Sequence, residues 1–298
     1  MKEKQIQVFC SKGWVDYELL DTGEREKLER FGKYIFVRPY EDAVWPKALT
    51  KEVQEKWAKA DGKFWSSKAG AKAGWKMSRT VLDKWEMEYK GIKFLAMPTP
   101  FRHMGFFPEQ ASHWDFIEER IKNSGKKVKL LNLFGYTGVA SLFALRAGAE
   151  VTHVDASKQV LNWAKENQKI NAELTDAPMR IIEDDAIKFL EREIKRGNKY
   201  DAVIMDPPKF GRGPRGEVWK IEEMLPKLLA QVLQVLSNKP LFVILTSYAT
   251  DSSSLSLGYA LKDIMQMSGG EVESGELCVL EKSKGRFIPL ANTAIWEV

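Results

Sequence analysis

The sequence predicts an α/β protein, with a mostly parallel sheet covered by helices on both faces, an antiparallel final hairpin and a small β-rich region in front. From about Ser112 onward, short apolar strands alternate with amphipathic helices, as in parallel sheets. Before that point, short strands are separated by Gly and Pro. The last two apolar segments follow each other without a helix between them. We therefore expect a β-rich substrate-binding region over residues 1–110 and an α/β domain over residues 111–298.

Each element is assigned from its local pattern. In the N-terminal region, strands are expected over Gln5–Cys10, Trp14–Leu20, Lys33–Pro39, Trp85–Tyr89 and Ile92–Met97, with a polar helix over Thr50–Ala60. In the α/β domain, parallel strands are expected over Val128–Phe134, Val151–Val154, Met179–Ile182, Tyr200–Met205 and Pro240–Thr246. The closing strand pair is expected over Glu271–Leu280 and Gly285–Val298.

Helices are expected between these strands, where apolar residues recur at helical spacing. They cover Ser112–Asn123, Thr137–Ala147, Ser157–Asn171, Asp185–Arg196, Glu222–Leu236 and Leu255–Met265. Ser112 is expected to cap the first of them.

Composition excludes several classes of protein. The chain has 298 residues, of which 44% are hydrophobic and 29% charged, which is ordinary globular composition. Its longest apolar run, Leu241–Leu245, is far shorter than a membrane span, and the charged N-terminus does not resemble a secretory signal. Two cysteines and three histidines make a disulfide framework or a metal site unexpected. We expect a cytoplasmic protein without a metal.

Positive charge is concentrated in the first third of the chain. Residues 1–110 hold 21 Lys and Arg against 16 Asp and Glu. The densest stretch, Gly62–Leu82, contains no acid and carries Phe64 and Trp75 among its cations. Cations attract phosphates and aromatic rings stack on unpaired bases, so this mixture favours contact with looped or single-stranded RNA. The alternative is a solvated loop whose aromatic rings pack into a small core. The RNA-binding candidates are Lys68, Lys72, Trp75 and Lys76.

Functional residues are sought at strand ends, because ligands of open α/β sheets bind beyond the carboxyl ends of the strands. The end of the first parallel strand carries the motif Asn132–Gly138, in which two glycines permit a sharp turn. The second ends at Asp155, whose carboxylate can accept hydrogen bonds from ribose hydroxyls. Nicotinamide dehydrogenases share this pairing, but their G-x-G-x-x-G turn is absent here.

The third and fourth strands end in acidic motifs. Glu183–Ala186 follows the third strand, and an acid there can meet an adenine amino group; helix capping by Asp185 is the alternative. The fourth strand ends in Asp206-Pro207-Pro208. Two prolines stop the strand and fix the backbone, so we expect their carbonyls, with the Asp206 carboxylate, to accept hydrogen bonds from a base.

In this order, the four motifs resemble those of class I S-adenosylmethionine-dependent methyltransferases, which have a Rossmann-like fold. Within that class, N-x-F-x-Y-T-G and D-P-P-K-F are similar to motifs of a large-subunit ribosomal RNA methyltransferase group. The resemblance covers roughly residues 100–298. It implies an enzyme that uses S-adenosylmethionine as its methyl donor.

The resemblance also implies residue roles. The cofactor-binding residues would be Phe134, Tyr136, Thr137, Gly138, Asp155, Ser157, Asp184, Asp185, Ala186 and Gln110. The catalytic residues would be Asp206, Pro207 and Pro208, and further substrate-binding residues would be Lys209, Phe210, Arg212, Arg215 and Tyr248. Arg212 and Arg215 are expected to hold phosphates from a mobile glycine-rich loop, although a solvated surface loop explains them equally well.

The predicted reaction is methyl transfer to a base nitrogen of RNA, with ribosomal RNA as the expected partner. Methylation of cytosine C5 requires a cysteine nucleophile, and neither Cys10 nor Cys278 lies at a strand end facing the cleft. The alternatives are a methyltransferase acting on protein or a small molecule, a non-catalytic RNA-binding module with the same fold, and a nicotinamide oxidoreductase.

Overall fold

The computed structural model describes residues 6–66, 73–78, 80–248 and 253–298. The chain divides into two compact units. The C-terminal unit contains Ser112–Leu277 and Pro289–Val298, together with the first described residues up to Phe9. The N-terminal unit contains Cys10–Ala111 and also Cys278–Ile288.

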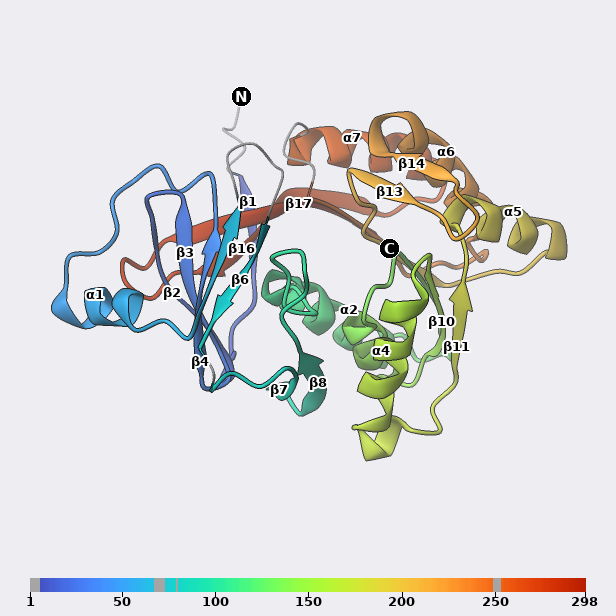
Figure 1. Cartoon of the computed structure of the whole chain (residues 1–298). Coiled ribbons are helices and arrows are strands. Elements are labelled where there is room, and N and C mark those ends of the chain that lie inside the picture. The colour runs from blue at the N-terminus through green and yellow to red at the C-terminus, as the bar shows by residue number, and fades with distance from the viewer. Residues whose placement is uncertain (1–5, 67–72, 79, 249–252) are drawn as a thin grey trace, which may run out of the picture. The chain divides into compact units, whose positions relative to one another are not determined.

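The centre of the C-terminal unit is a parallel sheet (Figure 1). Its five parallel strands, in the spatial order β15-β12-β9-β10-β11, are β9 (Lys129–Leu133), β10 (Glu150–Asp155), β11 (Met179–Glu183), β12 (Ala202–Met205) and β15 (Phe242–Ser247). Next to β15 lies β17 (Phe287–Glu297), which pairs with it antiparallel. The sheet continues with β16 (Glu271–Leu280) and ends at β1 (Gln7–Cys10). The predicted sheet, with its antiparallel closing strands, is confirmed.

Helices cover both faces of this sheet. They are α2 (Ala111–Asn123), α3 (Val139–Arg146), α4 (Lys158–Lys169), α5 (Ala186–Arg196), α6 (Ile221–Val235) and α7 (Ser254–Met265). One core is built from α5, α6 and α7 with alternate residues of the strands, such as Leu131, Val203 and Val243. The intervening residues face the other helices, as shown by the edge contact between Phe116 of α2 and Phe242 of β15. Because helix α2 begins at Ala111, the expectation that Ser112 caps it is wrong.

The N-terminal unit is rich in β-structure. A sheet contains β2 (Tyr17–Gly23), β3 (Glu26–Phe31), β4 (Tyr34–Pro39), β5 (Gly62–Ser66) and β6 (Ala73–Met77), in that order. A separate hairpin joins β7 (Trp85–Tyr89) to β8 (Ile92–Ala96), and α1 (Lys51–Ala58) is the one helix longer than a single turn among the described residues of this unit. Strands β3, β5 and β6 were not expected from the sequence.

Strand β3 has four charged residues out of six, which hides it in the sequence. In the structure Glu29 is fully buried and is paired by Arg38 of β4, whose guanidinium donates to both carboxylate oxygens at 2.6 and 2.7 Å. Lys27 lies 3.3 Å from the same carboxylate. These cations hold the pKa of Glu29 at about 2, although burial opposes them. A buried charge is tolerated because it is paired.

The N-terminal unit is completed by residues from the other end of the sequence. The Glu281 carboxylate is fully buried and accepts a hydrogen bond from the Thr22 amide at 2.6 Å. Arg286 donates to both oxygens of that carboxylate, and Ser283 donates to Asp21 at 2.6 Å. These contacts explain why Cys278–Ile288 belongs to this unit.

Candidate active site

The parallel strands place their carboxyl ends at one edge of the sheet. Leu133 lies opposite Val154 on one side and Met205 on the other, and Asp155 lies opposite Glu183. The loops that follow β9, β10, β11 and β12 therefore share this edge. The structure thus brings the four predicted strand-end motifs together.

The loop after β9 has an unusual backbone. Phe134, Tyr136 and Gly138 have φ values of 56°, 52° and 83°, so left-handed residues alternate along it. Only Gly adopts this conformation without a steric cost, and non-glycine residues held there cluster at ligand-binding sites. The Gly135 amide donates to the Val154 carbonyl at 3.0 Å, which ties the loop to the end of β10.

A buried hydrogen-bond chain supports this loop from beneath. Asn132 Nδ2 donates to Ser141 Oγ at 3.0 Å, Ser141 Oγ lies 3.0 Å from His153 Nδ1, and His153 Nε2 lies 3.2 Å from the Tyr136 carbonyl. A carbonyl only accepts, so Nε2 carries the proton and Nδ1 accepts from Ser141. Burial lowers the pKa of His153 to about 4, so the ring is neutral at physiological pH.

Asp155 is held by the loops on both sides of it. Its Oδ2 accepts from the Tyr136 amide and its Oδ1 from the Ser157 amide, each at 2.9 Å. Burial raises the pKa of this carboxyl above its ordinary value, while these two amides and that of Ala156 oppose the rise. Each carboxylate oxygen has a second acceptor site, so the oriented carboxylate can still receive hydroxyl groups. Ser157 contributes through its backbone.

Thr137 is 1% exposed, and its carbonyl accepts from the buried Asn167 amide group at 2.9 Å. Thr137 therefore supports the loop from a buried position, whereas Phe134 and Tyr136 of the same loop are half-buried.

The carboxylates after β11 have partners within the protein. Asp185 caps α5 by accepting from the Lys188 amide at 3.0 Å, which is the capping alternative considered above. Asp184 is buried, accepts from the Asp185 amide at 3.0 Å and forms an ion pair with Arg192. Ala186 is buried at the start of the helix. Contact of this turn with adenine stays a prediction.

The proline corner after β12 has a partner within the protein. Asp206 is half-buried, Pro207 is buried and Pro208 is exposed. The Pro208 carbonyl accepts a hydrogen bond from the Trp219 indole N–H at 2.6 Å. The protein therefore uses one of the two acceptor sites of this oxygen, and the expectation that both proline carbonyls accept from a base stays a prediction.

Trp219 links two of the strand-end loops, and sequence reasoning missed it. Its side chain is 3% exposed, and its ring meets Phe134 edge-on with centroids 4.9 Å apart. The same residue holds the carbonyl of Pro208. A lone Trp in a glycine-rich segment after a strand end was the available signal.

The segment that contains Trp219 is an ordered hairpin. Strands β13 (Phe210–Arg212) and β14 (Val218–Lys220) pair antiparallel. Arg212 thus lies in a short strand rather than in the expected loop, whereas Arg215 lies in the turn between the two strands; the phosphate-holding role of both stays a prediction. The hairpin forms because its inner side packs on the strand ends.

We expect Trp219→Phe to lower the free energy of unfolding by about 1 kcal/mol, because the hydrogen bond to Pro208 is lost while the ring is kept. The rate of methyl transfer should fall more than the cofactor affinity. Trp296→Phe is the matched control, because it loses a similar indole bond, 2.8 Å to Gly269, at the opposite end of β15. Urea unfolding and single-turnover rates measure both variants; equal rates in the two would contradict the linking role.

The remaining predicted residues are in varied settings. Lys68 and Lys72 lie outside the described residues. Lys76 is exposed on β6, whereas the Trp75 indole donates to the Thr99 carbonyl at 2.7 Å and its ring packs edge-on against Phe36 and Phe64. Trp75 therefore packs as the alternative interpretation supposed. Gln110 is half-buried in a short 3₁₀ turn, and half-buried Tyr248 follows the carboxyl end of β15.

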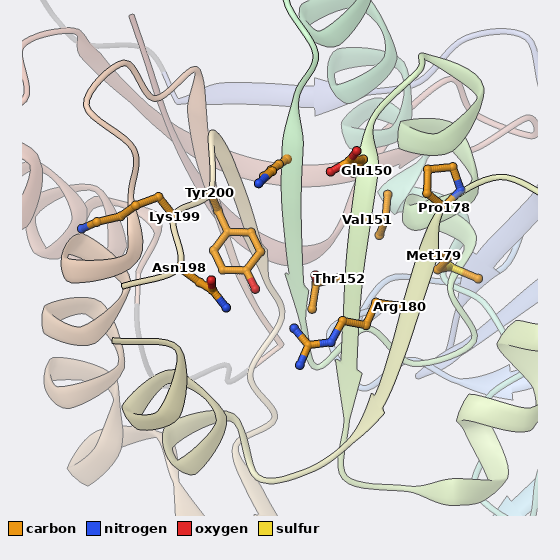
Figure 2. A pocket seen from close by; sticks show the side chains of 10 residues that line it. Glu150, Val151, Thr152, Pro178, Met179, Arg180, Asn198, Lys199 and Tyr200 are labelled. Carbon is orange, nitrogen blue, oxygen red and sulfur yellow. The ribbon is translucent and has the colours of Figure 1, made fainter. Parts of the chain in front are cut away.

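A cavity of about 460 Å³ lies at the opposite edge of the same sheet (Figure 2). It is lined at the amino ends of β9, β10 and β11 and by Asn198–Tyr200 before β12. Its polar groups mostly serve the protein: Tyr200 and Asn198 donate to Glu193 at 2.7 and 2.8 Å, and Lys199 donates to the Gln234 carbonyl. The cavity is thus separate from the strand-end loops.

Two further observations concern the described residues only. No three His, Cys, Asp or Glu side chains among them are placed to hold a metal ion. None of the helices in the described ranges combines the length and the apolar character needed to cross a membrane.

Relatives were found by sequence. The chain is 28% identical over 253 residues to ribosomal RNA large subunit methyltransferase K/L of Shewanella frigidimarina. The aligned region covers 78% of this chain and 34% of the relative. It is 34% identical over 125 residues to ribosomal RNA large subunit methyltransferase I of Aeromonas salmonicida. That aligned region covers 42% of this chain and 30% of the relative. The chain therefore spans about a third of the length of these curated relatives.

A solved structure matches nearly the whole chain. The S-adenosylmethionine-dependent methyltransferase from Agrobacterium tumefaciens is 41% identical, with a TM-score of 0.91, over 98% of this chain and 93% of the other. The profile of the S-adenosylmethionine-dependent methyltransferase family matches residues 49–242. This match takes in all four strand-end loops and confirms the predicted enzyme class and methyl donor. By its strand-end geometry and by this match, the chain belongs to the family of S-adenosylmethionine-dependent methyltransferases.

Proposed function

We propose that this chain transfers a methyl group from S-adenosylmethionine to a base nitrogen of RNA, with ribosomal RNA as the substrate. The observation that carries the proposal is the set of strand-end loops around Asp155, combined with relatives that are named as ribosomal RNA large subunit methyltransferases. Basic residues outnumber acidic residues in the segment 1–110, and this positive charge supports an anionic partner. A cytoplasmic location goes with this substrate.

The residues present fit the donor. The Asp155 carboxylate is oriented by two backbone amides, and its remaining acceptor sites would receive hydrogen bonds from ribose hydroxyls. The loop Phe134–Gly138, in which Phe134 and Tyr136 have positive φ values, brings the Tyr136 amide to that carboxylate. The turn Asp184–Ala186 would border the adenine. Bound S-adenosylmethionine supplies a methyl group on a positively charged sulfur.

We place the substrate atom that accepts the methyl group beside the turn Asp206–Pro208, which follows β12. Asp206 and Pro207 would position the nucleophilic atom in line with the methyl group, and positioning can supply much of the acceleration. A base nitrogen would attack the methyl carbon with its own lone pair while the carbon–sulfur bond breaks, and the electron pair of that bond would stay on sulfur, which leaves as the neutral thioether. The nitrogen would afterwards release its proton to Asp206 or to water. Lys209 and Tyr248 follow the carboxyl ends of β12 and β15 and would hold the substrate.

The two cysteines support a nitrogen target. Methylation of a pyrimidine C5 uses a thiolate that adds to the ring. Cys10 ends β1 and Cys278 lies within β16, so neither follows β12 or β15. Cys278 is buried, and burial raises the pKa of Cys10, which disfavours its thiolate.

The proposal is tested by incubating the chain with methyl-labelled S-adenosylmethionine and a mixture of ribosomal RNA, ribosomal protein and small metabolites. We expect label in RNA, and nuclease digestion followed by mass spectrometry should find it on a base nitrogen. Ribosomal RNA from cells that lack the protein should be the better acceptor. Label in protein or in metabolites alone would overturn the proposed substrate, and label on a pyrimidine C5 would overturn the proposed atom.

A further inference from the structure

The hairpin that follows the proline corner, residues 210–220, is called the β13–β14 ribbon below. We propose that its outer face binds an unpaired RNA segment beside the nucleotide that is methylated. This inference rests on the proposed function and adds which surface of the C-terminal unit holds the RNA, and in which form.

The pairing of the two strands gives the ribbon two faces. Phe210 lies opposite Lys220, and Arg212 lies opposite Val218. Neighbouring residues of a strand point to opposite sides, so these four side chains share one face, while Gly211 and Trp219 share the other. Burial follows this division, because the first four are exposed and Trp219 is buried.

The inner face and the tip anchor the ribbon to the sheet edge. Trp219 donates to the Pro208 carbonyl and touches Phe134. Glu217 forms an ion pair with Lys188 of α5, and its second oxygen accepts from the Arg215 amide at 2.8 Å. A Cβ on Gly213 would come within 2.9 Å of the Glu217 Cβ. Gly213, Glu217 and Trp219 therefore have structural roles, because each of them stabilises the conformation of the ribbon.

Three of the four outer side chains have no such explanation, whereas Lys220 donates to Glu223 of α6 at 2.8 Å. Phe210 is 56% exposed and Val218 is 51% exposed, and neither packs into the core. Arg212 and Arg215 are exposed, and no acid lies within ion-pair distance of either guanidinium in the described part of the chain. Residues 209–220 hold four basic residues and one acid, and that acid is paired to α5. The face is therefore apolar and cationic at once.

Unpaired RNA is the occupant that fits this chemistry. An exposed aromatic ring stacks on a base whose face is free, and the guanidinium groups attract the phosphates. The bases of duplex RNA are stacked on each other and offer no free face to Phe210. The ribbon begins at Phe210, three residues after Pro207, so RNA on it would lie close to the proposed acceptor position.

The test measures binding of a fluorescent short oligouridylate to the full chain, in parallel with a duplex RNA. Phe210→Ala should weaken oligouridylate binding about five- to 150-fold by loss of one stacked base and should leave duplex binding nearly unchanged. Arg212→Gln with Arg215→Gln should lower the slope of log affinity against log salt by about 1.4. S-Adenosylmethionine affinity, measured by calorimetry, should match the wild type and so verifies the fold of each variant.

Tyr259→Ala and Lys262→Gln on α7 are the matched controls, because both residues are exposed on another part of the C-terminal unit. Both controls should bind RNA as the wild type does. If Phe210→Ala and the double arginine variant also keep wild-type affinity and salt slope while the wild type methylates RNA, the inference is wrong and the proposed function stands. If the wild type neither binds nor methylates RNA, both are wrong.

Discussion

Asp155→Ala should weaken S-adenosylmethionine binding by about 1–3 kcal/mol, or about five- to 150-fold in the dissociation constant, because charge-assisted hydrogen bonds to the ribose are lost. The variant also leaves the Tyr136 and Ser157 amides without their acceptor, so the loop after β9 should become less stable. Isothermal titration calorimetry measures the affinity. Asp176→Ala, which removes an exposed carboxylate of the same unit, is the control and should bind normally.

The same carboxylate predicts a pH dependence. Burial raises the pKa of Asp155, so protonation begins at a higher pH than for an exposed aspartate. The ionised form is the better acceptor, and the wild-type affinity should therefore fall as the pH is lowered through that raised pKa. At neutral pH the raised value costs stability, and this cost disappears as the proton binds. A pH profile of affinity that is the same in wild type and Asp155→Ala would contradict the role of this carboxylate.

Gly135→Ala should lower the free energy of unfolding by about 1–3 kcal/mol, because the new methyl group overpacks a filled site. A Cβ at this position would lie 2.3 Å from Cε1 and 2.5 Å from Nδ1 of His153. The backbone φ of Gly135 is not in the left-handed region, so the expected effect comes from space alone. Displacement of the imidazole would also disturb its bond to the Tyr136 carbonyl and weaken cofactor binding.

A double-mutant cycle isolates this contact. His153→Ala removes the ring that the methyl group would meet, so Gly135→Ala should cost much less in that background, and the two effects should not add. Gly74→Ala is the control, since its Cβ would have only ordinary contacts, the nearest at 3.8 Å, and it should be nearly neutral. Strictly additive losses in urea unfolding would show that His153 does not limit the space at Gly135.

The strand ends could be predicted from the sequence because buried parallel strands are continuous apolar runs. Val203 and Val243 lie in such runs, and the motif after each run marks where it stops. The family predicted from these motifs is confirmed by the family match, and the predicted sheet with its closing antiparallel strands is confirmed by the strand pairing. The RNA substrate and the roles of individual residues stay predictions.

What the sequence did not predict depends on contacts between distant residues. Strand β3 is recognised only once Arg38 is seen beside Glu29. The β13–β14 ribbon resembles a loop because it is rich in glycine, and it becomes a hairpin through Trp219 and the pair between Glu217 and Lys188. Local propensity contains neither piece of information.

A crystal structure of the chain with bound S-adenosylhomocysteine tests the central claim most directly. The account predicts density at the carboxyl ends of β9 and β10, with the ribose hydroxyls on Asp155 and the amino-acid part along Phe134–Gly138. Density in the cavity of Figure 2 at the opposite edge of the sheet, with an empty edge at Asp155, would contradict it.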